Sequence, residues 1–203
     1  AVVDENGILE GISLDRLKRY GGVADKDPHV DEAEDIAAVK ENYEGFMEGN
    51  DEETKVIKDL ADKGNTFAQV AVSDKLRRDS SKFLEDGDTA NAVDTAQAAQ
   101  DFGKKAAESG RAEGYLAQAG GLLLESQAHN TEADEAEAAG DDDAAKEADK
   151  TAKKAVKLAV KANREGKRNG AHWEATPTQD ITRKDLDEAD AFAEDFVAAT
   201  SDR

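Results

Sequence analysis

The sequence predicts an all-α protein whose body consists of two antiparallel helical hairpins with alanine-rich seams, a four-helix-bundle-like arrangement. One segment carries alanines in alternating steps of three and four, the heptad spacing of a helix face: Ala145, Ala148, Ala152, Ala155, Ala159 and Ala162. The segment before it repeats this rhythm with Tyr115, Ala119, Leu122, Ser126, His129, Ala133 and Ala136. Gly140 and Asp141 lie between the two runs, where a turn is expected.

Folding the chain at Gly140 brings these two runs together in register. We call the contact between them the alanine seam. Ala119 then faces Ala162, and the pairing continues down to the turn. Small residues let two helix backbones approach closely, so that dispersion contacts replace bulky side chains. The spacing therefore predicts one antiparallel hairpin over residues 112–168.

A first version of this hairpin is predicted at 65–86 and 89–109, folded at Gly87 and Asp88. Its second helix has a small-residue seam of Ala92, Ala96, Ala99, Gly103 and Ala106. These residues are expected opposite Phe83, Asp79 or Ser80, Leu76, Val72 and Gln69. The two Gly-Asp turns lie 53 residues apart, which indicates a weak internal duplication. A helical-repeat protein is the alternative, although the Trp, Tyr and Pro landmarks of tetratricopeptide repeats are missing.

Gly120 and Gly121 interrupt the predicted helix at 112–139. Each glycine inside a helix costs about 1 kcal/mol relative to alanine. The pair indicates either a kink or frayed helix start, or a close crossing by another helix. The sequence does not decide between these interpretations.

Two short helices, 31–48 and 52–63, are expected before the hairpin body. Apolar residues recur on one side of each, and glycines follow their ends at Gly49 and Gly64. The predicted organisation is thus an N-terminal arm with a short helix (1–30), two short helices (31–64), a double hairpin (65–169), and a loop with a C-terminal amphipathic helix (170–203).

The apolar residues at the two chain ends are candidate partner-binding residues. Val2 and Val3 belong to the arm, and the helix expected at 183–199 carries Leu186, Phe192, Phe196 and Val197. These ends lie outside the hairpins, so we expect them to bury against neighbouring subunits. Folding back onto the chain's own helices is the competing expectation.

Composition indicates a strongly acidic protein. The chain has 203 residues, a formal net charge of -20 and a hydrophobic content of 38%. Such an acidic surface is typical of proteins from salt-in halophiles, because molar salt shortens the Debye length to about 3 Å and screens self-repulsion. An acidic, partly disordered mesophilic protein is the alternative. The absence of cysteine excludes disulfides and thiolate zinc sites.

Several compartments and chemistries find no support in the sequence. No apolar run approaches the roughly 18 residues of a membrane span, and the first residues resemble neither a signal peptide nor a basic targeting sequence. We therefore expect no membrane partner and a cytoplasmic or virion-associated location.

Di-iron Glu-x-x-His pairs, a Gly-x-Ser-x-Gly elbow and a P-loop are all missing. His129, four residues after Glu125, is expected as a seam residue that is hydrogen-bonded or half exposed, rather than as a metal ligand. Neither a cofactor nor enzymatic activity is predicted.

One basic stripe stands out in this acidic chain. Its members follow steps of three and four along the helix predicted at 141–169: Lys146, Lys150, Lys153, Lys157, Lys161, Arg164 and Arg168. A solvated face paired with nearby acids is one interpretation, and contact with an acidic neighbouring subunit is another. In the second case Lys150, Lys157 and Lys161 are candidate partner-binding residues. Nucleic acid is not expected as a partner, because the rest of the chain would repel phosphate.

Together these features favour a non-enzymatic structural or assembly subunit of a halophilic system. The predicted layout of arm, hairpin body and docking helix suits a multimeric particle, such as a virion protein of the capsid or head–tail connector type. Its partners would be copies of itself and other subunits. The alternative is a monomeric, helical-repeat-like adaptor that binds a partner protein.

Overall fold

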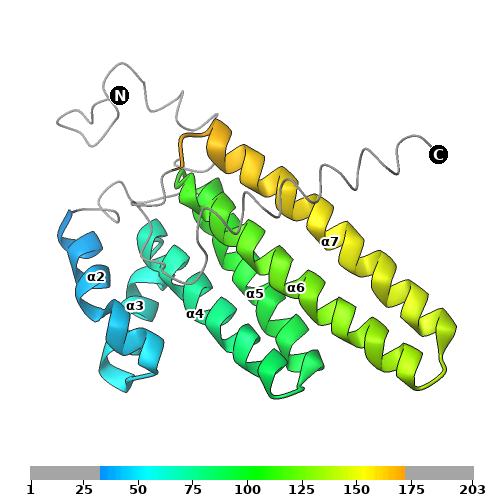
Figure 1. Cartoon of the computed structure of the whole chain (residues 1–203). Helices are drawn as coiled ribbons and strands as arrows, with labels where there is room; N and C mark the ends of the chain where they lie inside the picture. Colours follow the sequence, from blue (N-terminus) through cyan, green and yellow to red (C-terminus); the bar gives the residue numbers. More distant parts are fainter. Residues whose placement is uncertain (1–32, 172–203) are drawn as a thin grey trace.

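The structure, a computed structural model, describes residues 33–171, and within this range it contains α-helices and no strands (Figure 1). The predicted all-α class is confirmed for these residues. The six described helices are α2 (Ala33–Glu48), α3 (Asp51–Asp62), α4 (Thr66–Glu85), α5 (Thr89–Glu108), α6 (Glu113–Ala138) and α7 (Asp142–Arg168).

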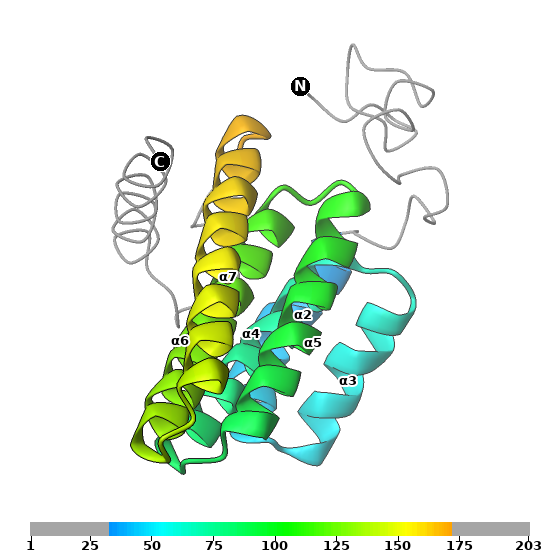
Figure 2. The ribbon, with the colours of Figure 1, turned by 90° about the vertical axis from the view of Figure 1, so that its right-hand side faces the viewer.

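These helices pack as consecutive antiparallel pairs. The most extensive contacts join α4 to α5, α5 to α6 and α6 to α7, while α4 also contacts α2, α3 and α6. Helices α2 and α3 therefore lie at one edge of the molecule and α7 at the other (Figures 1 and 2). Because α5 packs on α6 as well as on α4, the two predicted hairpins form one continuous series.

The turns at Gly87 and Gly140 are those that the sequence predicts. Gly87 has φ +77° and Gly140 has φ +78°, a left-handed conformation that glycine adopts without strain. After the first turn, the Asp88 amide donates to the Phe83 carbonyl at 2.8 Å. The Asp141 amide makes the corresponding 2.9 Å bond to the last turn of α6.

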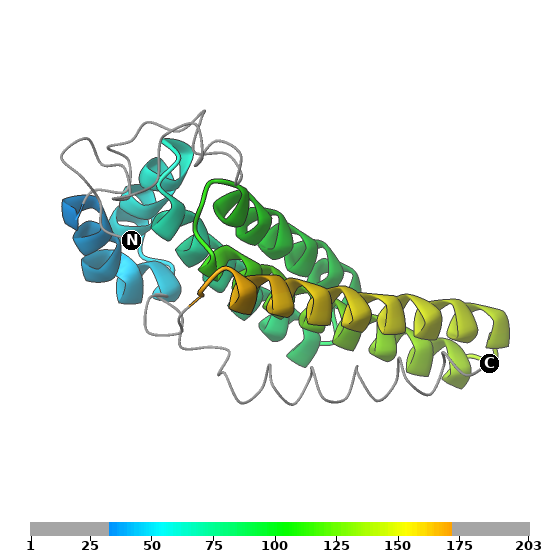
Figure 3. The same cartoon turned by 90° about the horizontal axis from the view of Figure 1, so that it is seen from above.

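The aspartate after each glycine then caps the next helix. The Asp88 side chain accepts a 3.3 Å hydrogen bond from the Asn91 amide at the start of α5. The Asp141 side chain accepts a 3.1 Å bond from the Ala144 amide at the start of α7. A Gly-Asp pair thus ends one helix and begins the next. Helices α6 and α7 have 26 and 27 residues against 20 in α4 and α5, and their hairpin reaches beyond the α4–α5 turn (Figure 3).

Large side chains fill the core between α2, α3 and α4. The buried cluster contains Val39, Phe46, Met47, Ile57, Ala61, Phe67, Ala68, Ala71 and Val72. Ile36, Tyr43, Leu60, Leu76 and Phe102 pack against it while partly buried. This cluster is the conventional part of the core, in which the hydrophobic effect acts through aliphatic and aromatic surface.

A buried ion pair lies on α4 beside this cluster. Asp74 and Arg77 bond to each other with side-chain exposures of 0% and 2%. The Tyr43 hydroxyl of α2 donates to Asp74 Oδ2 at 3.0 Å. Burying a charge is costly unless it is paired, and Arg77 supplies that partner for Asp74 within α4. The bond from Tyr43 to Asp74 then favours one orientation of α4 against α2.

Serines on α4 bond to the backbone of α5. Ser73 Oγ donates to the Ala99 carbonyl and Ser80 Oγ to the Ala92 carbonyl, each at 2.7 Å. The small-residue seam of α5 is buried, as predicted, with Ala92, Ala96, Ala99 and Ala106 at 0% exposure. The α4 side differs in part from the prediction. Ser80, one of the predicted residues, reaches the Ala92 carbonyl, but Ser73 and not the predicted Leu76 reaches the Ala99 carbonyl. Leu76 instead packs against the large-residue core.

The α6–α7 hairpin has the predicted register. Ala119, Leu122, Ala155, Ala159 and Ala162 form one buried cluster, as the pairing of Ala119 with Ala162 requires. Near the open end of the hairpin, a Cβ atom built on Gly166 would lie 3.0 Å from Leu116, which continues the same register. The seam prediction is therefore confirmed for the half of the hairpin that contains this cluster. Nearer the turn, the predicted seam alanines are only half-buried: Ala133, Ala136, Ala145 and Ala148.

Glycines bring α5 and α6 into backbone contact. A Cβ built on Gly103 would lie 2.6 Å from the Gln118 amide nitrogen, and one on Gly121 would lie 3.0 Å from the Ala96 carbonyl oxygen. A Cβ on Gly114 would overlap the backbone of Gly103 and Ala107. Helix α6 runs without a break from Glu113 to Ala138. The close approach of α5 therefore explains the glycine at 121, and α6 does not fray at this point.

The predicted N-terminal arm and C-terminal helix lie outside the described residues. No helix among residues 33–171 is long and apolar enough to cross a membrane.

Candidate functional site

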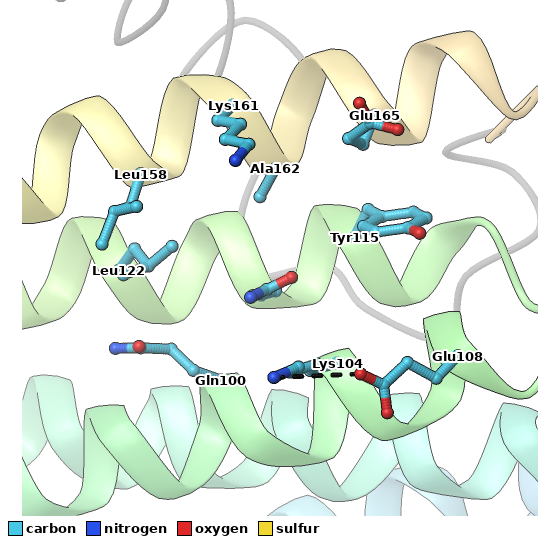
Figure 4. Close-up of a pocket in the computed structure, with 10 residues that line it drawn as sticks. Gln100, Lys104, Glu108, Tyr115, Leu122, Leu158, Lys161, Ala162 and Glu165 are labelled. Carbon is cyan, nitrogen blue, oxygen red and sulfur yellow. Dashed lines mark ion pairs between the residues drawn. The ribbon is translucent and has the colours of Figure 1, made fainter. Parts of the chain in front are cut away.

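A groove runs over α6 between α5 and α7 and encloses a volume of about 340 Å³. Figure 4 shows the side chains that converge on it from these three helices. The groove is lined by Gln100, Lys104 and Glu108 of α5, Tyr115, Gln118 and Leu122 of α6, and Leu158, Lys161, Ala162 and Glu165 of α7.

The floor of the groove is apolar. Leu158 is 43% exposed, and it lies beside Leu122 at the α6–α7 contact (Figure 4). Tyr115 and Ala162 continue this surface toward the open end of the hairpin. Burying apolar surface is favourable by about 25 cal/mol per Å², so an exposed leucine in a groove favours contact with an apolar group.

The rim of the groove is charged and carries both signs. Lys104 Nζ lies 3.8 Å from Glu108 Oε1 on the α5 side, and Lys161 and Glu165 line the α7 side. The side-chain amide nitrogen of Gln100 is buried and has no hydrogen-bond partner among the described residues. Apolar surface below and polar groups at the edges are the composition of sites that receive amphipathic protein segments.

The predicted basic stripe lies on α7, and all seven of its members are exposed. Lys161 also lines the groove, whereas Lys150 and Lys157 lie on the outer face of α7, opposite the alanine seam. Local acids bond to some stripe members: Lys153 lies 2.9 Å from Asp149. The other candidate residues, Leu186, Phe192, Phe196, Val197, Val2 and Val3, lie outside the described residues.

His129 has the expected role of a hydrogen-bonded seam residue. It is buried, its Nδ1 lies 2.9 Å from Glu132 Oε2, and its Nε2 lies 4.0 Å from Glu125 Oε1. Within residues 33–171, no group of three or more His, Asp or Glu side chains is arranged to hold a metal ion.

Sequence reasoning missed Leu158 as a site residue. Tyr115, Leu122 and Ala162 were assigned to the seam, but Leu158 lies off the seam and next to the basic stripe. A large aliphatic residue at a position that the heptad rhythm places outside the hairpin core is the signal that could have identified it.

No protein-family model, no curated protein and no solved structure matches the chain.

Proposed function

We propose that the chain is a non-enzymatic assembly subunit, a component of a larger multimeric particle such as a virion protein of the capsid or head–tail connector type. In this proposal the groove over α6 receives an amphipathic helix of another subunit. The observation that carries the proposal is the exposed Leu158 beside Leu122 and Tyr115, with charged residues at both rims.

The surrounding packing supports a docking role for this groove. The α5 wall is fixed to α6 by glycine contacts, and the α7 wall is fixed by the alanine seam. Rigid walls lower the entropic cost of binding, because few groove side chains must be ordered when the partner arrives. Apolar contact also suits the halophilic setting that we propose from the charge of -20, since molar salt screens exposed ion pairs but not buried apolar surface.

The alternative function is a monomeric adaptor that binds a partner protein in the same groove. The observation that favours it is the packing of consecutive antiparallel helix pairs, which is also the architecture of helical-repeat binding proteins. Both proposals assign the groove to a helical partner, and they differ in whether that partner is another subunit of a stable particle.

Light scattering coupled to size-exclusion chromatography tests the assembly proposal. In molar salt the full chain should form a discrete oligomer, and Leu158→Glu should reduce its mass to that of the monomer. Val56→Glu is the matched control, because Val56 on α3 is the other exposed large hydrophobic residue among those described, at 36%. The control should leave the oligomer intact if α3 itself is not part of the contact.

A wild-type chain that remains monomeric in molar salt would contradict the assembly proposal and favour the adaptor. If both variants keep the oligomer, the groove is not the contact. A second series at about 0.1 M salt, where the Debye length is about 10 Å, tests the halophilic setting. There we expect the helices or the oligomer to weaken, and unchanged circular dichroism and mass would contradict that setting.

A further inference from the structure

The two walls of the groove present their charges in the same order along its length. On the α7 wall, Lys161 and Glu165 follow Leu158 by three and seven residues, which places all three on one side of the helix. On the α5 wall, Lys104 is followed by Glu108. Helices α5 and α7 both run antiparallel to α6. The two lysines therefore lie at one level of the groove, and the two glutamates lie about one helical turn nearer the open end of the hairpin (Figure 4).

These charged groups differ in how far their neighbours already compensate them. Glu165 Oε1 lies 2.7 Å from Arg168 Nη1, and Lys104 Nζ lies 3.8 Å from the Glu108 carboxylate. Lys161 is exposed and makes no ion pair or hydrogen bond with another of the described residues. Leu158, one turn before Lys161, is 43% exposed. An occupant that brings an apolar group to Leu158 and a carboxylate to Lys161 would therefore supply what this wall lacks.

Helix α3 carries an apolar residue, an acid and a base at the same spacing. Val56, Asp59 and Lys63 are three and seven residues apart, and all three are exposed. Val56 is the other exposed large hydrophobic residue in the described part of the chain. The side chains of Asp59 and Lys63 have no ion pair or hydrogen bond within residues 33–171. Lys63 caps the helix with φ -73° and ψ -10°, so it continues the helical face.

The two patterns have opposite charges at corresponding positions. When α3 of one copy lies parallel to α7 of another, Val56 meets Leu158 and Asp59 meets Lys161. Lys63 then faces the level of the two glutamates. Val56 projects from an exposed helix face, and a ridge of this kind fits the groove between two other helices. Each of the three positions on α3 thus meets a group of complementary chemistry.

We infer that α3 of a second copy of the chain occupies the groove between α5 and α7. This inference rests on the proposed function, because it names the helix of another subunit that the groove receives. Within one molecule α3 packs on α2 and α4, at the edge of the helical series opposite α7 (Figures 1 and 2). The contact therefore joins two different surfaces of identical copies. Repeating such a contact links the copies into a closed ring or an open chain.

Disulfide trapping between two copies tests the inference. The chain contains no cysteine, so Val56→Cys and Leu158→Cys each introduce a single thiol. The two variants are refolded together in molar salt, in equal amounts, and then oxidised. We expect a covalent dimer on a denaturing gel, because side chains in contact allow the Cβ separation of about 3.5–4.5 Å that a disulfide requires.

Two controls show whether the trapped contact is specific. Each variant oxidised alone should stay monomeric on the gel, because a contact between different surfaces does not bring two copies of one residue together. Lys150→Cys on α7 replaces Leu158→Cys in the matched control. Lys150 is exposed but does not line the groove, so its mixture with Val56→Cys should give no covalent dimer.

Charge exchange tests the predicted pairing of Asp59 with Lys161. Asp59→Lys and Lys161→Asp should each dissociate the oligomer, because each places like charges opposite each other. The two substitutions in one chain should restore the oligomer. Light scattering measures the mass at the lowest salt at which the wild-type oligomer persists, since molar salt screens the pair. Asp62→Lys with Lys150→Asp makes the same charge changes at exposed positions outside the contact and should leave the mass unchanged.

Failure of this inference is distinguishable from failure of the proposed function. If Leu158→Glu dissociates the oligomer but Val56→Glu does not, and no mixed covalent dimer forms, another helix occupies the groove and the proposed function stands alone. Covalent dimers of either cysteine variant with itself would show a contact between equal surfaces and overturn the inference. Failure of the charge exchange to restore the oligomer would overturn the predicted pairing. A wild-type chain that is monomeric in molar salt would overturn both proposals.

Discussion

The two edges of this helical series exclude water in different ways. Between α2, α3 and α4, aromatic and aliphatic side chains such as Phe46, Ile57 and Phe67 fill the space between helices. Between α5 and α6, glycines let the helices approach until backbone touches backbone. Between α6 and α7, a seam made mainly of alanines is buried around Leu122. Both parts bury their facing residues almost completely. The part made of α2, α3 and α4 does so with large side chains, and the part made of α5, α6 and α7 does so with short distances between helices.

The difference determines which substitutions each part tolerates. Where large side chains fill the space, removing atoms leaves a cavity, and the loss grows with the volume removed. Where backbones are in contact, there is little to remove, and adding atoms forces the helices apart. The large-residue edge should therefore be sensitive to truncation, and the small-residue edge to enlargement.

The largest effect is expected from Phe46→Ala. Phe46 is 2% exposed in the large-residue core, and Phe→Ala in such a position costs about 3–5 kcal/mol of unfolding free energy. Urea unfolding followed by circular dichroism measures the loss. Val56→Ala, an exposed position on the same edge, is the control and should cost much less. Equal losses for the two variants would contradict the description of this edge as a filled core.

Gly114→Ala should have the next largest effect. The new Cβ would overlap the Ala107 and Gly103 backbone, which cannot move without shifting all of α5. Such overpacking costs about 1–3 kcal/mol, and the higher helix propensity of alanine offsets at most about 1 kcal/mol of it. Gly45→Ala is the matched control, since its Cβ meets only the flexible Glu53 side chain. The control should be neutral or slightly stabilising in urea unfolding. A loss as large as that of Gly114→Ala would show that contact with the α5 backbone is not what makes Gly114 sensitive to substitution.

Ala152→Leu should have a smaller effect, about 1–2 kcal/mol, at the lower end of the range for overpacking. Ala152 is 1% exposed in the seam with α6, but α7 is an edge helix and can shift outward to admit the leucine. Ala144→Leu, just off the seam at an exposed position in the first turn of the same helix, should change the melting temperature little. Identical melting temperatures for the two variants would argue against the alanine seam.

The local parts of this fold could be predicted from the sequence with good accuracy. The described helix ends lie within about two residues of their predicted positions, because a glycine with positive φ follows the end of each helix. The α6–α7 register followed from matching the two seam patterns about Gly140. Both features depend on residues close together in the chain, where spacing determines geometry.

The contact between α5 and α6 and the groove beside it were not predicted. The sequence assigns the seam of α5 to α4 alone, yet a Cβ atom built on Gly103 would lie 2.6 Å from the Gln118 amide nitrogen of α6. A single helical period indicates which residues are buried, but not how many helices bury them. Predicting the groove requires the positions of three helices at once. Leu158 becomes part of a groove only because α5 lies opposite α7.

The order of packing along the chain has a consequence for how the protein forms during synthesis. Each helix has its most extensive contacts with a helix that is adjacent in sequence, so the described fold has a low contact order. Proteins with such local contacts fold within microseconds to milliseconds, whereas a ribosome adds roughly 5–20 residues per second. A newly made helix can therefore pack on the preceding helix once both have left the ribosome, and we expect the series to form from α2 toward α7 during translation.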